Sequence, residues 1–545
     1  MAHKEKDLQW LLQKDVQDLI QSRLDQEPWI TVYSSINSEN ENGGVHCALI
    51  PESRVKEVLT YDSWDLKPYE GMPYYEKYQE DGTKVFYLRF GDKSDEGIEP
   101  LVFCRSFYGI KPSSVEISEE FRHFHNLYHD HKTNKYIRIR EDGEEEEIIK
   151  FEDNSVKMKV LQLKQFLTIK DMRLAVYFDF VRNSCRSLEE LGITEVEDRF
   201  NDNKTCYSLT VRKDDFSVEK DCKTYSRLFG KRLLAGIDKE KLAIWPYDKP
   251  ANLYIDFVIG VTKNGENISY TCNPSQLNNL FGSKPGAPNY FTPVFFRPDV
   301  LQKYYAYPEK YTVGDGKLYC GDLWGLRMDN NRKDFVIVFL GDLGRDLAYN
   351  EQIYWKNFNV PPEGGISEVA RTRGFKAKPA DPEKADLLFK HVFGQFQSNW
   401  LNKFDWPLFK WLKSGDSYIY NSLRVPLVDS QKEFDEQVLA LAKILVESLN
   451  VKKLQEALPK KVKHEKSITK LERFLISQGL DDCMPYIKFL RNLYDLRHGA
   501  GHIKGETYEK AAAFFHLTEK YRKTVFENVL RKAIEFLTYL QEHLL

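Results

Sequence analysis

Residues 430–449 read SQKEFDEQVLALAKILVESL, a stretch in which apolar side chains return every three or four positions. This period predicts an amphipathic α-helix. The repeating apolar residues are Phe434, Val438, Leu441, Leu445 and Leu449. Ser430 and Glu433 match a capping box, in which the Ser hydroxyl accepts the amide of the third helical residue and the Glu side chain reaches back. The sequence therefore predicts a helix that begins just after Ser430.

Further helical patterns follow this segment up to the last residue, at about 467–477, 484–498, 505–520 and 521–543, with no strand pattern between them. We therefore expect an antiparallel helical bundle and assign residues 383–545 to one all-α domain. Before it, residues 361–382 contain four prolines and three glycines and show no sustained period. This composition predicts a linker.

Residues 1–360 have a different character, because short runs of β-branched and aromatic residues alternate there with turn-forming residues. The runs are ITVYSSI (30–36), KVFYLRFG (84–91), KYIRIRE (135–141), LAVYFDFV (174–181), LYIDFVIGV (253–261) and DFVIVFLGD (334–342). We expect a β-rich region, with a break into two subdomains near 190–250. The predicted fold class is α+β: a β-rich N-terminal region followed by an all-α C-terminal bundle.

The charge distribution is uneven along the chain. The 545 residues carry a formal net charge of −3, so no global field draws the protein to nucleic acid or to an anionic membrane. Residues 451–545 contain 18 Lys and Arg against 12 Asp and Glu, a net charge of +6, which leaves −9 for the remainder. A basic bundle on an acidic body suits a polyanionic partner, although solvated helix faces alone can also produce it.

The sequence contains no apolar stretch of the length that crosses a bilayer. Its first 24 residues carry charges throughout, where a signal peptide has an uninterrupted apolar segment. We therefore expect a cytoplasmic protein without a membrane partner.

The segment 491–510, RNLYDLRHGAGHIKGETYEK, places two arginines and two histidines around a Gly-Ala-Gly break. Leu490, Leu493 and Tyr494 form an apolar stripe, and Arg497 is its next member by spacing. A guanidinium group there requires an anion or a full set of acceptors. Arg491 is placed to pair with Asp495 along the helix surface.

Two explanations of this segment involve no catalysis by an Arg/His pair. In the first, basic residues at the end of a helix are stabilised by its dipole and followed by a glycine cap. In the second, His498 and His502 bind a metal, because they are four residues apart as on zinc-binding helices. The glutamate of HExxH is missing and no third ligand is near, so we predict no metal and no cofactor.

The same residues support a third interpretation, because the segment resembles the HEPN superfamily. The signature of that superfamily is an Arg followed by a His after four to six residues, late in a helical bundle. Arg497 and His502 fit with four intervening residues, and Arg491 and His498 fit with six. The chain also resembles the Apea-like HEPN branch of bacterial defence proteins, in which a large N-terminal region precedes the HEPN domain.

The resemblance implies a metal-independent endoribonuclease in antiviral (anti-phage) defence or a stress response. It implies that Arg497 and His502 are catalytic, with Arg491 and His498 as the second choice, and that Arg491 and Lys504 contact RNA. HEPN domains complete their sites in pairs, which implies a homodimer or a higher even oligomer. A phage- or nucleotide-derived trigger would act through residues 1–360, which sense the trigger or restrain the nuclease. The alternative is a non-catalytic HEPN-like protein that binds RNA or dimerises.

Two further stretches invite an interpretation. FRHFHNLYHDHK (121–132) contains four histidines that could bind a ligand, namely His123, His125, His129 and His131; the alternative is a surface loop or helix. WLNKFDWPLFKWL (400–412) contains Trp400, Trp406 and Trp411. We expect these tryptophans to form apolar packing between the β-rich body and the bundle.

Overall fold

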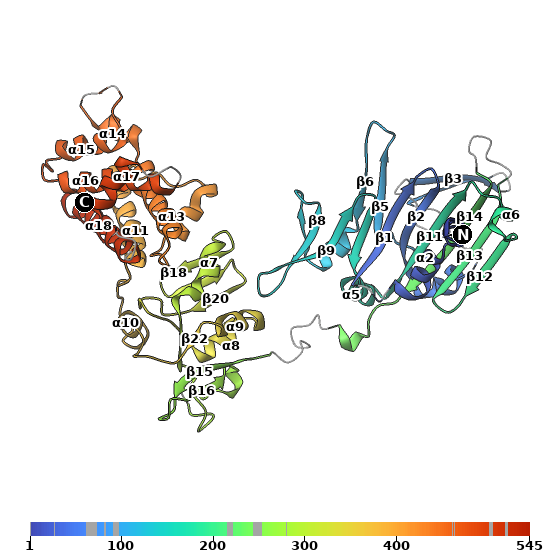
Figure 1. Ribbon diagram of the computed structural model, residues 1–545, viewed down its shortest axis with the longest axis horizontal. Helices are drawn as coiled ribbons and strands as arrows, with labels where there is room; N and C mark the ends of the chain where they lie inside the picture. The colour runs from blue at the N-terminus through green and yellow to red at the C-terminus, as the bar shows by residue number, and fades with distance from the viewer. Residues whose placement is uncertain are drawn as a thin grey trace. The chain divides into compact units, whose positions relative to one another are not determined.

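The computed structural model describes residues 2–24, 26, 28–60, 73–80, 83–90, 97–214, 222–242, 253–279, 281–459, 462, 464–500, 505–517 and 522–545. The chain divides into two compact units, Met1–Arg140 with Glu144–Ala251, and Glu141–Gly143 with Asn252–Leu545. The first is built on a large antiparallel sheet, and the second joins small sheets to a helical bundle (Figure 1). The α+β class predicted from the sequence is confirmed.

The first unit is organised by a ten-stranded sheet of order β12-β13-β14-β11-β2-β1-β10-β9-β8-β7. Its strands are β1 (Trp29–Asn37), β2 (Glu41–Pro51), β7 (Tyr128–Asp130), β8 (Lys135–Ile139), β9 (Glu145–Glu152), β10 (Ser155–Lys159), β11 (Met172–Ser184), β12 (Val196–Asn201), β13 (Thr205–Lys213) and β14 (Thr224–Leu234). All the neighbouring strands of this sheet pair antiparallel.

The central strand β11 is covered on both faces, which explains its continuous apolar run from Leu174 to Phe178. Successive side chains of a strand point to opposite faces. Val176 and Phe178 belong to one core cluster, whereas Ala175 and Tyr177 belong to another. The other elements of this unit are α1 (Ala2–Leu11), α2 (Lys14–Asp18), α3 (Val55–Val58), α4 (Glu119–Phe124), α5 (Val160–Lys170), α6 (Leu188–Leu191) and the hairpins β3–β4 (Pro73–Glu80, Thr83–Phe90) and β5–β6 (Val102–Phe107, Lys111–Ile117).

Residues 253–360 of the second unit form small antiparallel sheets with short helices. The strands are β15 (Asp256–Val261), β16 (Asn267–Thr271), β17 (Pro293–Phe296), β18 (Tyr311–Gly314), β19 (Lys317–Cys320), β20 (Trp324–Arg327), β21 (Val336–Phe339) and β22 (Asn359–Val360), and the helices are α7 (Gln302–Ala306), α8 (Leu340–Asp346) and α9 (Tyr349–Lys356). Buried Trp355 donates to the Tyr304 hydroxyl at 2.7 Å, which in turn bonds Glu351 at 2.5 Å. The predicted strands at 30–36, 84–91, 135–141, 174–181 and 253–261 overlap with β1, β4, β8, β11 and β15. Of the run 334–342 only Val336–Phe339 is a strand, β21, because α8 begins at Leu340.

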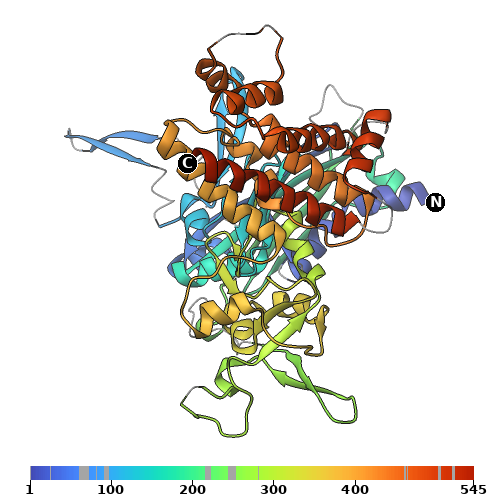
Figure 2. The same ribbon diagram turned by 90° about the vertical axis from the view of Figure 1, so that its left-hand side faces the viewer.

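The bundle consists of α11 (Ala385–Phe404), α12 (Ser417–Ser422), α13 (Gln431–Ala442), α14 (Val451–Ala457), α15 (Ser467–Ser477), α16 (Met484–Leu496), α17 (Glu506–Phe514) and α18 (Arg522–Leu544). Helices α15, α16, α17 and α18 correspond to the four segments predicted downstream of residue 449, but α17 ends at Phe514 rather than near 520. Helices α11 and α18 lie side by side in both views (Figures 1 and 2). No described helix is both long and apolar enough to cross a membrane.

The start of α13 forms only half of the predicted capping box. The Ser430 hydroxyl accepts the Glu433 amide at 3.2 Å, as expected. The Glu433 carboxylate, however, turns outward from its helix and accepts from the amides of Leu427 and Val428 and from Arg424. Glu433 therefore holds the segment that leads into α13 in place and does not complete the capping box.

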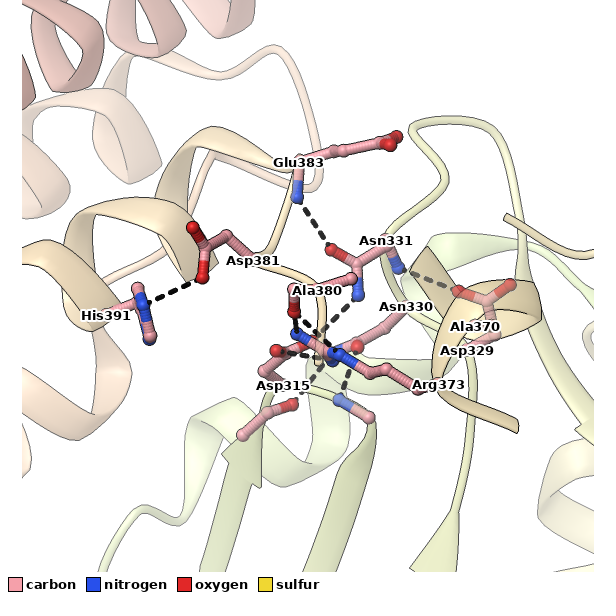
Figure 3. A network of polar contacts seen from close by, with 12 residues as sticks. Asp315, Asp329, Asn330, Asn331, Ala370, Arg373, Ala380, Asp381, Glu383 and His391 are labelled. Carbon is pink, nitrogen blue, oxygen red and sulfur yellow. Dashed lines mark hydrogen bonds and ion pairs between the residues drawn. The ribbon is translucent and has the colours of Figure 1, made fainter. Parts of the chain in front are cut away.

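The segment 361–382 contains a helix, α10 (Glu368–Phe375), and is fastened to residues 315–331 by polar contacts (Figure 3). Buried Asp329 accepts from the amide and the hydroxyl of Ser367 at 2.6 and 2.8 Å. Arg373 pairs with Asp315 at 2.7 Å and donates to the Ala380 carbonyl. We call Asp315, Asp329, Asn331, Ser367 and Arg373, with the Ala380 carbonyl, the polar clamp. The two compact units divide at residue 251, well before this segment.

The tryptophans of 400–412 do not lie as expected from the sequence. Trp400 is fully buried inside the bundle, where it contacts Phe396, Phe404, Trp406 and Phe474. Trp411, in contrast, is 67% exposed. The expected packing between body and bundle is therefore wrong for both residues: α11 directs Trp400 into the bundle core, and Trp411, which follows α11, is exposed to solvent.

Candidate active site at the end of helix α16

Helix α16 places the Arg/His segment at one end of the bundle. Pro485 occupies the first turn, where its missing N–H costs no helical hydrogen bond. Ile487, Leu490, Leu493 and Leu496 are buried at helical spacing. The α-helix ends at Leu496 and continues as a 3₁₀ turn, η9 (Arg497–Ala500). Leu496 rather than Arg497 thus completes the buried stripe, and Arg497 stands beside it at the edge of the core.

Arg497 is held by two neighbours. Its Nη1 donates to the carboxylate of Glu447, and its guanidinium carbon lies 4.0 Å from the centre of the Tyr494 ring. The side chain is 23% exposed. Its Nε is buried and finds no acceptor among the residues that the structure describes. The guanidinium group therefore retains N–H groups that the described part of the chain leaves uncommitted.

Glu447 reaches Arg497 from a π-helical turn, η8 (Lys443–Glu447), which directly continues α13. Isolated π turns of this kind occur frequently at functional sites. Glu447 is not apparent as a site residue from the sequence, because it lies fifty residues before Arg497. The available signal was a charged residue placed between the apolar residues Leu445 and Leu449.

Two further ionisable side chains lie next to Arg497. Partial burial raises the pKa of the Asp495 carboxyl above its ordinary value, while the charges of His498, Lys466 and Arg497 act in the opposite direction. The His498 ring lies edge-on to Tyr494, with ring centres 6.0 Å apart. Tyr494 therefore contacts both Arg497 and His498, which belong to different predicted pairs.

Arg491 lies apart from this group in its contacts. It donates to Glu472 of α15 at 2.5 Å, and its side chain is 44% exposed. The partner expected from the sequence was Asp495, but the neighbouring helix supplies a carboxylate instead. His502 and Lys504 lie outside the described residues, so the pairing of Arg497 with His502 stays a prediction.

Of the four histidines of 121–132, His129 and His131 lie together, whereas His123 and His125 have separate environments. His125 is buried against Phe121 and Phe124, and its Nε2 lies 2.9 Å from the Gln162 carbonyl oxygen. His123 is exposed and lies 3.3 Å from Glu119. His129 stacks on Tyr136 and contacts the His131 ring. Among the described residues no group of three His, Cys, Asp or Glu side chains is arranged to hold a metal ion.

Comparison with known proteins adds no assignment to this geometry. No protein-family model, no curated protein and no solved structure matches the chain.

Proposed function

We propose that the protein is a metal-independent endoribonuclease of the HEPN type, acting in antiviral (anti-phage) defence or a stress response. The observation that supports this most is the placement of Arg497. It directly follows an amphipathic helix of a basic bundle, and most of its guanidinium N–H groups have no acceptor among the described residues. Such a group can donate parallel hydrogen bonds to a phosphate.

The proposed chemistry needs a proton carrier and a phosphate holder. A ribose 2′-hydroxyl attacks the adjacent phosphorus, the bond to the 5′-oxygen breaks, and a cyclic phosphate and a 5′-hydroxyl result. His502 exchanges the proton, since an imidazole with an ordinary pKa near 6.5 carries and releases protons at neutral pH. Arg497 stabilises the charge that builds on the phosphate. Arg491 and Lys504 contribute further contacts to the RNA backbone.

A single Arg and a single His make a small active site, which two copies of the chain would enlarge. We therefore propose a homodimer or a higher even oligomer in the cytoplasm. The N-terminal region would hold the enzyme inactive until a phage- or nucleotide-derived trigger arrives. The terminal helix α18 does not supply the interface with its apolar side, because Phe526, Leu530, Phe536 and Leu540 are buried in its own bundle.

A second candidate function is a non-catalytic protein that binds RNA or dimerises. The Arg497–Glu447 ion pair favours it, because the carboxylate already neutralises the arginine. An arginine kept in such a pair can serve the fold alone.

Labelled single-stranded RNA incubated with the protein in EDTA distinguishes the two functions. The endoribonuclease yields fragments ending in a cyclic phosphate. Arg497→Lys loses most of this activity, because lysine lacks the planar guanidinium group that donates two parallel hydrogen bonds to a phosphate. Arg491→Lys serves as the control and retains more activity. Cleavage that disappears with the chelator and returns with Mg²⁺ or Zn²⁺ contradicts the metal-free mechanism. RNA binding without cleavage under every condition supports the second candidate.

A further inference from the structure

We propose that a cavity in the helical bundle binds a nucleobase. The cavity has a volume of about 230 Å³ and lies among α11, the loop after it, α12 and the turn η8. It is smaller than the roughly 300–1,000 Å³ of pockets that hold drug-sized ligands, and so suits a single ring system. Its lining residues are Phe393, Gly394, Gln397, Lys410, Trp411, Leu412, Ser417, Tyr420, Asn421, Ile444 and Ser448.

Three aromatic side chains, Phe393, Trp411 and Tyr420, line the cavity. Phe393 and Tyr420 lie with ring centres 5.8 Å apart, and Trp411 stands at the outside with most of its surface exposed. Bases stack on such rings, and an exposed indole gains contact area when a flat ligand covers it. The walls therefore favour a planar aromatic ligand over an aliphatic one.

Gln397 gives the cavity a specific polar group. The residue is 2% exposed, and its Nε2 donates to the Phe409 carbonyl at 2.8 Å. This bond commits the amino end of the amide and leaves Oε1 as its other polar end. Oε1 is shielded from solvent and accepts no hydrogen bond from any residue that the structure describes. A buried acceptor without a donor is unfavourable, and since Oε1 has no accessible surface in this structure, a ligand N–H reaches it only when the Gln397 side chain shifts toward the cavity.

Gly394 keeps one wall of the cavity free of a side chain. It lies inside the 20-residue helix α11, where glycine is less favourable than alanine. A Cβ atom at this position would meet no other atom within 4 Å. Packing therefore does not require glycine here, whereas the close approach of a ligand to the backbone does explain it.

These features together identify the chemistry of the ligand. A nucleobase is flat and aromatic and carries N–H donors on its edge, and Lys410 beside the cavity can hold an attached phosphate. The base can come from a free nucleotide or from an RNA strand. This inference goes beyond the proposed cleavage, because a base can bind here whether or not the chain cuts RNA.

Titration calorimetry on the full chain tests the inference with ligands that cannot be cleaved. The ligands are AMP, GMP, CMP and UMP, and 2′-O-methyl hexanucleotides of each base. Gly394→Leu fills the cavity, and Asn399→Leu, on an exposed part of the same helix, is the matched control. We expect Gly394→Leu to weaken binding about tenfold or more, equivalent to ~1.4 kcal/mol, and the control to bind as the wild type does.

The pattern of loss identifies the source of the base. A loss of mononucleotide binding indicates a free nucleotide, and a loss confined to the hexanucleotide indicates a base within a strand. Thermal melts check that each variant folds, and Trp411→Ala replaces Gly394→Leu if the latter does not. Binding that is equal in the cavity variant and the control, or no binding of either ligand by the wild type, overturns the inference.

Discussion

Arg497, at the start of the 3₁₀ turn that follows α16, donates to Glu447, which ends a π turn fifty residues earlier in the chain. The ion pair joins two elements that approach each other only in the folded bundle. On the proposed function, RNA phosphate and the Glu447 carboxylate compete for one guanidinium group.

Replacing Glu447 with Gln removes this competing charge. We expect Glu447→Gln to lower the Kd for a 2′-O-methyl RNA roughly twofold to fivefold, because a partly exposed pair is worth about 0.4–1 kcal/mol. Fluorescence anisotropy measures the affinity. Glu456→Gln is the control, since it removes a charge from α14 that lies near Lys453. If Glu447→Gln only lowers stability and leaves the Kd unchanged, Arg497 serves the fold and the proposed competition is wrong.

Substitution of the two histidines beside the Gly-Ala-Gly break distinguishes between the two predicted Arg/His pairs. We expect His502→Ala to reduce RNA cleavage by a factor of about 10²–10⁴, the usual contribution of a general acid–base group. His498→Ala should be milder, since the His498 ring contacts Tyr494 at the edge of the core. Single-turnover cleavage measures both rates. The reverse order of effects would assign catalysis to Arg491 and His498.

We expect the protein to self-associate, because each chain carries only a small number of candidate catalytic groups. Light scattering at micromolar concentration should report a dimer or a multiple of one. Shortening the chain before α18 should unfold the bundle rather than produce a folded monomer, because ten residues of this helix are buried. A monomer that persists in the presence of RNA contradicts the expectation.

The polar clamp offers a measurable contribution to stability. Arg373→Ala removes an ion pair with Asp315 and the bonds to the Ala380 carbonyl, and should cost about 1–2 kcal/mol of unfolding free energy. Limited proteolysis should then cut faster between residues 376 and 384. Arg371→Ala in the same helix breaks only an exposed pair with Glu368. Equal behaviour of the two variants would show that the clamp contributes nothing.

Burial of His125 makes the first unit sensitive to acid. Desolvation lowers the pKa of His125 to about 4, below its ordinary value near 6.5. The unfolded chain therefore binds more protons than the folded one between these values, so stability falls as the pH falls from about 6.5 to 4. The loss amounts to about 3 kcal/mol. Denaturant unfolding of wild type and His125→Leu across this range measures it, and His123→Ala is the exposed control.

Local pattern predicts the helices of the bundle well and their contacts poorly. The periodicity and the Ser430 cap place α13 and α15 within a residue or two, because these signals act between neighbours in sequence. The order of the ten-stranded sheet and the use of Glu433 outside its helix depend on residues that meet only after folding. The sequence likewise suggests Arg497 as a site residue but does not reveal that Glu447 would meet it.

The π turn η8 determines the direction in which the side chains that follow it point. A helix advances about 100° per residue, so each inserted or deleted residue rotates everything that follows. Ile444 of this turn lines the cavity, and Glu447 holds Arg497. The deletion of one residue between them would keep the segment helical and yet turn Glu447 away from the arginine. One π turn thereby sets the angular offset between Ile444 at the cavity and Glu447 at the arginine.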